Sequence, residues 1–167
     1  ENNADFFGMI FYEKSPRNIT YNEARILTSA SKEMRIQPVG VFVDHEIHDL
    51  KKIISSLELK HIQLHGNEDQ LYIDEIKKQF DIKIIKKISI NNSEDLSKID
   101  KFMNIEYLLF DYKPDDNELP GGNSKSFDWN LLKDKKIKLP WFISGGINET
   151  NIKNIQNLLN PNGIDLS

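Results

Sequence analysis

The fold is decided by residues 38–64, where PVGVFV (38–43) is followed by EIHDLKKIISSL (46–57) and then by HIQL (61–64). The first segment is a nearly continuous apolar run, which is typical of a parallel strand buried on both faces. The middle segment places its apolar residues on one stripe, at the spacing of an amphipathic helix. The stretch therefore predicts a strand, a helix and a second, parallel strand.

The same alternation extends over the whole chain. The expected strands are Phe6–Tyr12, Pro38–Val43, His61–Leu64, Ile82–Ile88, Tyr107–Asp111, Trp141–Ser144 and Gly163–Leu166. The expected helices are Asn22–Met34, Glu46–Leu57, Glu68–Phe80, Glu94–Phe102, Asp128–Lys135 and Glu149–Leu159, with Ser93 and Asn148 as N-caps of the fourth and sixth. Successive strands begin about 26 residues apart, which suits a compact βα unit of a barrel.

Seven strands and six helices predict an α/β fold, a (β/α)8 TIM barrel that is incomplete at both ends. An open doubly wound sheet is less favoured, because no glycine-rich phosphate turn follows the first strand. At 167 residues the chain is expected to form a single domain, 1–167. With one strand missing, two parallel edges would stay unpaired, so we expect this chain to be unstable as a monomer.

Composition excludes several classes of function. The 22 basic and 26 acidic residues give a net charge of −4, which argues against nucleic-acid binding by phosphate neutralisation. No apolar run is long enough to span a membrane. Cysteine is absent, which excludes disulfides, Cys-ligated zinc and a thiol nucleophile from these residues, and which favours the cytoplasm. His48 and His61 lack metal-ligand spacing, so no metal site is expected.

Active sites of βα barrels lie at the carboxyl ends of the strands. Arg17, after the first strand, could clamp a carboxylate or phosphate, or be a surface arginine. His65 could donate to a substrate oxygen, or be structural. Asp111 ends an apolar strand, so desolvation should raise its pKa and suit it to general acid chemistry, unless it caps a loop. Asp44 also follows a strand, but an N-cap role in the next helix is favoured.

Glycine pairs supply the candidate phosphate site. Gly145 and Gly146 follow a strand and precede a helix, where backbone N–H groups can approach a phosphate, although an ordinary left-handed turn is the alternative. Gly121 and Gly122 lie in a loop long enough to be a lid or a binding loop, or simply a solvated loop. The last strand leads into Asp165 and Ser167 at the same expected edge.

Together these segments resemble the phosphoribosylanthranilate isomerase family, and they follow that family's order over essentially the whole chain. The segments that carry the resemblance are ADFFGMIFY (4–12) with SPR (15–17), VGVFV (39–43), QLHGNE (63–68), LLFD (108–111), GG (121–122) with FDW (127–129), SGGIN (144–148) and GIDLS (163–167). The QLHGNE (63–68) and SPR (15–17) motifs together are specific for the family, whereas either motif alone is a weak signal.

The resemblance implies an Amadori rearrangement of N-(5′-phosphoribosyl)anthranilate in tryptophan biosynthesis, without cofactor or metal. It implies that Asp111 is the general acid and that Arg17 holds the anthranilate carboxylate. It also implies that Gly145, Gly146 and the segment ending at Ser167 cradle the phosphate. His65, Gly121, Gly122 and Asp165 complete the expected substrate-binding set.

The chain departs from the family's pattern in three ways. The family's base is a cysteine in a Lys-x-Cys-Gly motif on its first strand, and no cysteine is present here, so the general base is absent from this chain. We therefore expect these 167 residues alone to be inactive or nearly so. The Ser-Gly-Val-Glu segment and last helix of the family are also absent. Asn123 and Ser124 replace the usual continuation of the Gly121-Gly122 loop.

Two alternatives remain open at this point: another phosphate-binding barrel isomerase, and a non-catalytic barrel that binds a phosphoribosyl ligand. In all three cases the partner is a small phosphoribosyl molecule, with no nucleic acid or membrane. For the oligomeric state, the sequence is compatible with a monomer or a homodimer.

Overall fold

The computed structural model describes residues 4–114 and 125–166, which form two compact units, one up to Ile85 and one from Lys86 onward. Each unit is described by itself. Gly121, Gly122 and Ser167 lie outside the described residues. That residues 1–167 form a single domain stays a prediction.

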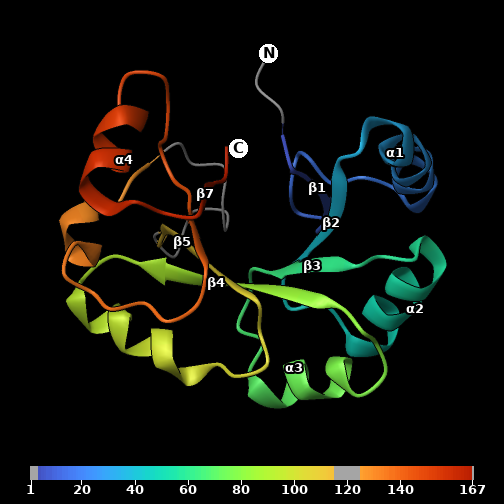
Figure 1. The fold of residues 1–167 in the computed structure, drawn as a ribbon. Coiled ribbons are helices and arrows are strands. Elements are labelled where there is room, and N and C mark those ends of the chain that lie inside the picture. Colours follow the sequence, from blue (N-terminus) through green and yellow to red (C-terminus); the bar gives the residue numbers. More distant parts are fainter. Residues whose placement is uncertain (1–3, 115–124, 167) are drawn as a thin grey trace. The chain divides into compact units, whose positions relative to one another are not determined.

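The elements alternate as the sequence predicts (Figure 1). Their order is β1 (Phe6–Phe11), α1 (Tyr21–Met34), β2 (Gln37–Phe42), α2 (Ile47–Leu57), β3 (His61–Leu64), α3 (Gln70–Lys77), β4 (Lys83–Ile90), η1 (Ser93–Lys101), β5 (Tyr107–Tyr112), η2 (Trp129–Leu132), β6 (Trp141–Ile143), α4 (Ile152–Leu159) and β7 (Gly163–Ile164), where η denotes a 3-10 helix. No helix among the described residues combines the length and the apolarity needed to cross a bilayer.

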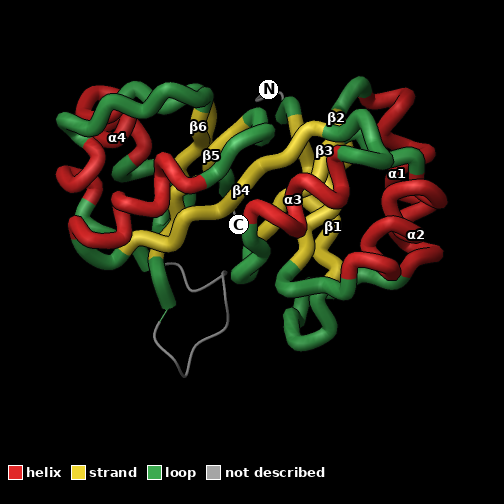
Figure 2. Tube along the Cα trace, turned by 90° about the horizontal axis from the view of Figure 1, so that it is seen from below, coloured by secondary structure: helices red, strands yellow, loops and turns green. Residues whose placement is uncertain are grey.

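In the first unit β1, β2 and β3 are parallel neighbours, and the start of β4 follows β3, where the Lys83 N–H donates to the Lys60 carbonyl at 2.9 Å. Helices α1 and α2 lie together on one side of these strands (Figure 2). A capping box formed by Thr20 and Glu23 starts α1, because each side chain accepts a backbone N–H of the other residue. The unit's core is apolar and includes Phe42, Leu50, Ile54, Ile62 and Leu64.

In the second unit the neighbouring strands of the sheet are, in order, the rest of β4, β5, β6 and β7. The Lys113 N–H donates to the Ile90 carbonyl at 3.1 Å, which joins the end of β4 to β5. Strands β5 and β6 are parallel, with Phe110 beside Ile143, and β6 is parallel to β7. Phe110, Ile143 and Ile155 are fully buried in this unit. The carboxyl ends of β5, β6 and β7 therefore share one edge of the sheet.

Three helix predictions for the second unit are wrong in detail. The helices expected at Glu94–Phe102 and Asp128–Lys135 are 3-10 helices instead. Asn92, and not Ser93, is the N-cap of η1, because its Oδ1 accepts the Glu94 N–H at 2.9 Å. The Asp95 carboxylate in turn accepts the Asn91 and Asn92 N–H groups at 3.0 and 3.4 Å. Local side-chain bonds of this kind hold such short segments in tight turns.

The sixth predicted helix begins later than expected, at Ile152. Asn148 is not its N-cap, because its Oδ1 accepts the Thr150 N–H and hydroxyl at 2.9 and 2.6 Å and so closes a turn before the helix. The Asn151 amide donates to the Gly146 carbonyl at 2.8 Å, which ties that turn back to the end of β6. The segment from Gly146 to α4 is therefore a fixed turn and not a helical extension.

Candidate active site

Every described candidate residue lies in or after the carboxyl end of a strand of its own unit. Arg17 and His65 follow β1 and β3 in the first unit. Asp111 is near the end of β5 in the second unit, and Gly145, Gly146 and Asp165 follow β6 and β7. This is the placement that the sequence predicts for a barrel active site.

Asp111 is a buried carboxyl group, 6% exposed, as the sequence predicts. Burial raises its pKa, because the charged form loses its hydration. Three neighbours oppose that shift: the positive charge of Lys87, the Tyr112 N–H, which donates to Oδ1 at 2.9 Å, and the Ser144 hydroxyl. The raised pKa keeps more of the protonated form near neutral pH than an exposed aspartate would have, which suits a proton donor.

Gly145 lets the chain after β6 pass directly over the acid. Its φ of +89° lies in the left-handed region. A Cβ at this position would stand 2.8 Å from the Lys125 carbonyl oxygen and 3.0 Å from Asp111 Oδ1. The glycine is therefore needed for the close approach to Asp111 as well as for any approach to a phosphate.

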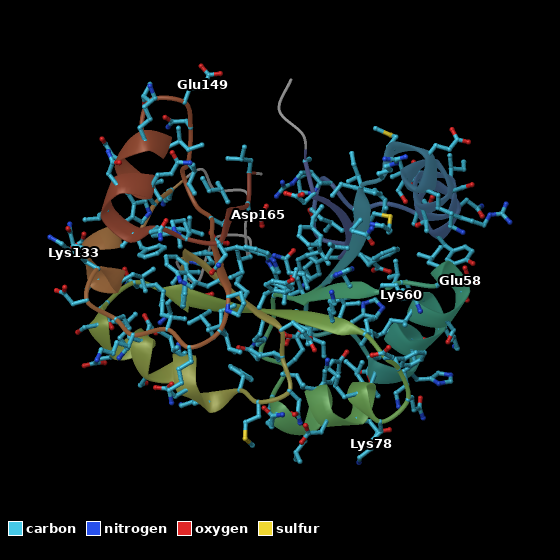
Figure 3. The ribbon with its side chains drawn as sticks, viewed as in Figure 1. Glu58, Lys60, Lys78, Lys133, Glu149 and Asp165 are labelled. Atoms are coloured by element: carbon cyan, nitrogen blue, oxygen red, sulfur yellow. The ribbon has the colours of Figure 1, made fainter. Side chains whose placement is uncertain are left out.

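The turn after Gly146 leads into the N-terminus of α4, a place in a fold where anions can bind. Gly146 also has a positive φ, of 65°. Part of the turn's backbone is bonded within the turn, because the Asn151 and Ile152 N–H groups donate to the Asn148 carbonyl at 3.2 and 3.0 Å. Asp165 follows β7, and its N–H donates to the Ile143 carbonyl at 2.9 Å, which continues the pairing with β6. Figure 3 shows Glu149 at the outer tip of the loop before α4, with its side chain directed away from the unit.

His65 stands on a loop that buried and exposed carboxylates hold in place. The backbone N–H of His65 donates to the Phe42 carbonyl at 2.8 Å. The next turn is closed by Glu68, 5% exposed, which accepts the Asp44 and Gly66 N–H groups at 2.9 and 3.3 Å. Asp44 in turn accepts from the backbone and side chain of Asn67. This carboxylate pair joins the ends of β2 and β3 and fixes the exit of His65.

The N-cap role predicted for Asp44 is wrong. Glu46 is the N-cap residue of α2, without a side-chain cap bond, and Asp44 has a φ of 46° and reaches across to Asn67 instead. Sequence reasoning also missed Glu68 as a residue that shapes the site. The signal was present in the sequence, because Glu68 is the last residue of the QLHGNE motif (63–68).

Gly66→Ala is expected to lower the free energy of unfolding by about 1–3 kcal/mol, as overpacking usually does. A Cβ at Gly66 would collide with the Asp44 carboxyl group and backbone, which cannot move without breaking the Glu68 and Asn67 bonds. Urea unfolding measures the change. Gly8→Ala in β1 is the matched control, because its Cβ would meet only a methyl carbon of Val41, at 3.3 Å. Equal losses in the two variants would contradict the role of Gly66.

Arg17 is exposed on a short loop that is itself well anchored. Ser15 closes a turn to Tyr12 and accepts the Arg17 N–H on its hydroxyl at 3.2 Å. The Ile19 N–H then returns to the Ile10 carbonyl at 3.0 Å. The backbone is thus fixed while the guanidinium stays accessible, as a carboxylate or phosphate clamp requires.

The site consists of protein side chains and backbone donors. Over residues 4–114 and 125–166, no three His, Asp or Glu side chains gather in a way that could hold a metal ion. The first unit offers an accessible guanidinium, and the second offers a buried acid and a glycine turn before a helix. Each part is of a kind that proton transfer to an anionic substrate uses.

The chain as a whole is similar to proteins of known function. The family model of N-(5′-phosphoribosyl)anthranilate (PRA) isomerase matches residues 1–167. A curated N-(5′-phosphoribosyl)anthranilate isomerase from Zymomonas mobilis is 38% identical over 166 residues, which is 98% of this chain and 77% of that protein.

Solved structures match as well. A monomeric form of the dimeric phosphoribosylanthranilate isomerase from Thermotoga maritima superposes with a TM-score of 0.80 at 28% identity, covering 98% of this chain and 76% of that one. A phosphoribosylanthranilate isomerase in complex with reduced 1-(o-carboxyphenylamino)-1-deoxyribulose 5-phosphate superposes with a TM-score of 0.80 at 27% identity, covering 98% and 76%. These matches confirm the predicted α/β fold class of the TIM-barrel type.

Proposed function

The chain belongs to the N-(5′-phosphoribosyl)anthranilate isomerase family, and on that premise we propose which of its residues bind the substrate and which transfer protons. The family's reaction converts N-(5′-phosphoribosyl)anthranilate into 1-(2-carboxyphenylamino)-1-deoxyribulose 5-phosphate, an Amadori rearrangement in tryptophan biosynthesis. We assign the general acid to Asp111. Its burial, with the raised pKa that follows, is the single observation that carries the assignment.

The acid acts in the first step. Asp111 donates its proton to the ribose ring oxygen as the C1′–oxygen bond breaks, and the nitrogen lone pair forms the C=N bond of a Schiff base. Removal of the C2′ proton then gives an enolamine, which tautomerises to the ketone. The family resemblance gives that second proton transfer to a cysteine, and none occurs among these 167 residues. The proposal therefore assigns no base.

The binding residues follow from charge and accessibility. Arg17 is proposed to hold the anthranilate carboxylate, because its exposed guanidinium can form two parallel hydrogen bonds with a carboxylate. His65 is proposed to donate to a substrate oxygen from its anchored loop. Gly145, Gly146 and the segment through Asp165 to Ser167 are proposed to hold the phosphate.

Further site and partner assignments belong to the same proposal. The Gly121-Gly122 segment is proposed to contribute to substrate binding. The partner is a small phosphoribosyl molecule, in line with the analogue that a solved relative holds. We propose a monomer or a homodimer, since a related isomerase is described as dimeric, and a cytoplasmic location.

Arg17→Met is expected to weaken binding of the reduced product analogue about 10- to 100-fold and to raise KM, while kcat changes less. A hydrogen bond to a charged group contributes roughly 1.5–3 kcal/mol, which corresponds to that range. Isothermal titration calorimetry measures the affinity. Arg25→Met serves as control, because Arg25 is also an exposed arginine, on α1. If both variants bind like the parent protein, Arg17 is not the carboxylate clamp.

A further inference from the structure

Two adjacent lysines in the middle of β4 are almost completely buried. Lys86 is 2% exposed and Lys87 is 5% exposed. Buried lysines are rare unless a charge or ligand compensates them. A charged or aromatic group is therefore expected to stabilise each of these two buried ammonium groups.

The two lysines point in opposite directions. The Lys86 ammonium lies over the Phe102 ring, 5.5 Å from its centroid, on the side of the segment that follows η1. Because side chains alternate along a strand, Lys87 points to the other face of the sheet. Lys86 is thereby accounted for by a cation–π contact, whereas Lys87 is directed elsewhere.

The pairing of β4 with β5 puts Lys87 on the face of Asp111. The Lys113 N–H donates to the Ile90 carbonyl, and in a parallel pair this bond sets Ile90 beside Tyr112 and Ser89 beside Asp111. Lys87 is two residues before Ser89 and shares its face. Its positive charge acts on the Asp111 carboxyl group from the neighbouring strand, two residues before the position directly beside Asp111.

This arrangement matters for a buried acid. Burial alone would make Asp111 a reluctant donor, because the carboxylate left after proton transfer would be an isolated charge in a dry site. An ammonium group on the same face stabilises that carboxylate, and the Ser144 hydroxyl and Tyr112 N–H help. We propose that Lys87 is a positioning residue of the isomerase reaction, whose charge stabilises the Asp111 carboxylate as its proton leaves.

The proposal rests on Asp111 being the acid, as proposed above. Within the described part of the second unit, the groups that face Asp111 are Lys87 from β4, Ser144 from the end of β6 and the backbone of Tyr112. Lys125 approaches Gly145 only through its carbonyl oxygen, and its ammonium lies 5.7 Å from the Tyr112 ring centroid. Lys87 is thus a cation that acts on this carboxyl group.

The test is the pH profile of kcat/KM for the enzyme as its gene encodes it, measured for the parent, Lys87→Met, Lys87→Arg and Lys86→Met. An acid works while protonated, so its ionisation gives the high-pH limb of the profile. Removing the ammonium raises the pKa of Asp111 further, so in Lys87→Met the limb moves to higher pH. The low-pH plateau falls about tenfold, less than the roughly 10²–10⁴-fold that a positioned acid contributes in total. Lys87→Arg is expected to restore both the position of the high-pH limb and the height of the low-pH plateau.

The control separates charge from packing. Lys86→Met removes an equally buried lysine from the opposite face of β4, so its high-pH limb is expected to stay in place. If Lys87→Met does not fold, Lys87→Gln is measured with the same expectation. An unmoved limb with uniformly lower kcat/KM would overturn the role of Lys87. Full activity in Asp111→Asn would instead overturn the acid assignment itself, which keeps the two proposals distinguishable.

Discussion

Asp111→Asn is expected to lower kcat for the isomerisation by about 10²–10⁴-fold, the contribution of a positioned general acid. The amide has the shape of the carboxyl group and can still accept the Tyr112 N–H, which donates to Oδ1 at 2.9 Å in the parent protein. It cannot release a proton to the ribose ring oxygen. Binding of the reduced product analogue should therefore stay close to that of the parent enzyme, while turnover is lost.

Asp95→Asn is the matched control for that result. Asp95 is as buried as Asp111, 6% exposed, and lies in the same unit, but it is bonded to Lys98 and to the backbone of Asn91 and Asn92. Those partners hold the pKa of its carboxyl group below its usual range, against the effect of burial. Its replacement should cost stability and leave turnover intact. An Asp111→Asn enzyme within tenfold of the parent kcat would refute the acid assignment.

Gly145→Ala is expected to lower both the stability and the turnover of the enzyme. The left-handed φ of +89° disfavours any side chain, and the new Cβ would press on the Lys125 carbonyl and on Asp111 Oδ1. We expect the free energy of unfolding to fall by about 1–3 kcal/mol. We also expect kcat to fall about 10²-fold, because a displacement of about 1 Å at a reacting group has an effect of that size.

The double variant Gly145→Ala/Asp111→Asn identifies the cause of that loss. If the alanine acts by displacing the acid, the double variant turns over no more slowly than Asp111→Asn alone, because the displaced group is already inactive. Losses in kcat that simply multiply would mean that Gly145 acts on the phosphate and not on Asp111. Steady-state kinetics of the four proteins decide between the two.

The sequence was sufficient for the order and type of most elements. Apolar runs located the strands, and His61–Leu64 was predicted to the residue, because buried parallel strands need continuous apolar segments. The two 3-10 helices were missed because their form depends on side-chain bonds such as those of Asp95 and Asp128. Apolar periodicity does not report such bonds.

The surroundings of a candidate residue were predictable where they are local and not where they depend on another strand. The burial of Asp111 follows from the apolar residues before it, and its raised pKa follows from that burial. Asp44 was misassigned because its partner Asn67 is far away in the sequence. Lys87 gave no signal, since nothing in one strand shows which residue of the next strand stands beside it.

The most direct test is product formation by the protein as its gene encodes it. Purified enzyme is mixed with N-(5′-phosphoribosyl)anthranilate, and the product is identified by NMR and mass spectrometry. The account predicts 1-(2-carboxyphenylamino)-1-deoxyribulose 5-phosphate, formed without added metal or cofactor. A folded protein that binds the reduced product analogue but forms no product would contradict it and would favour a non-catalytic barrel that binds phosphoribosyl ligands.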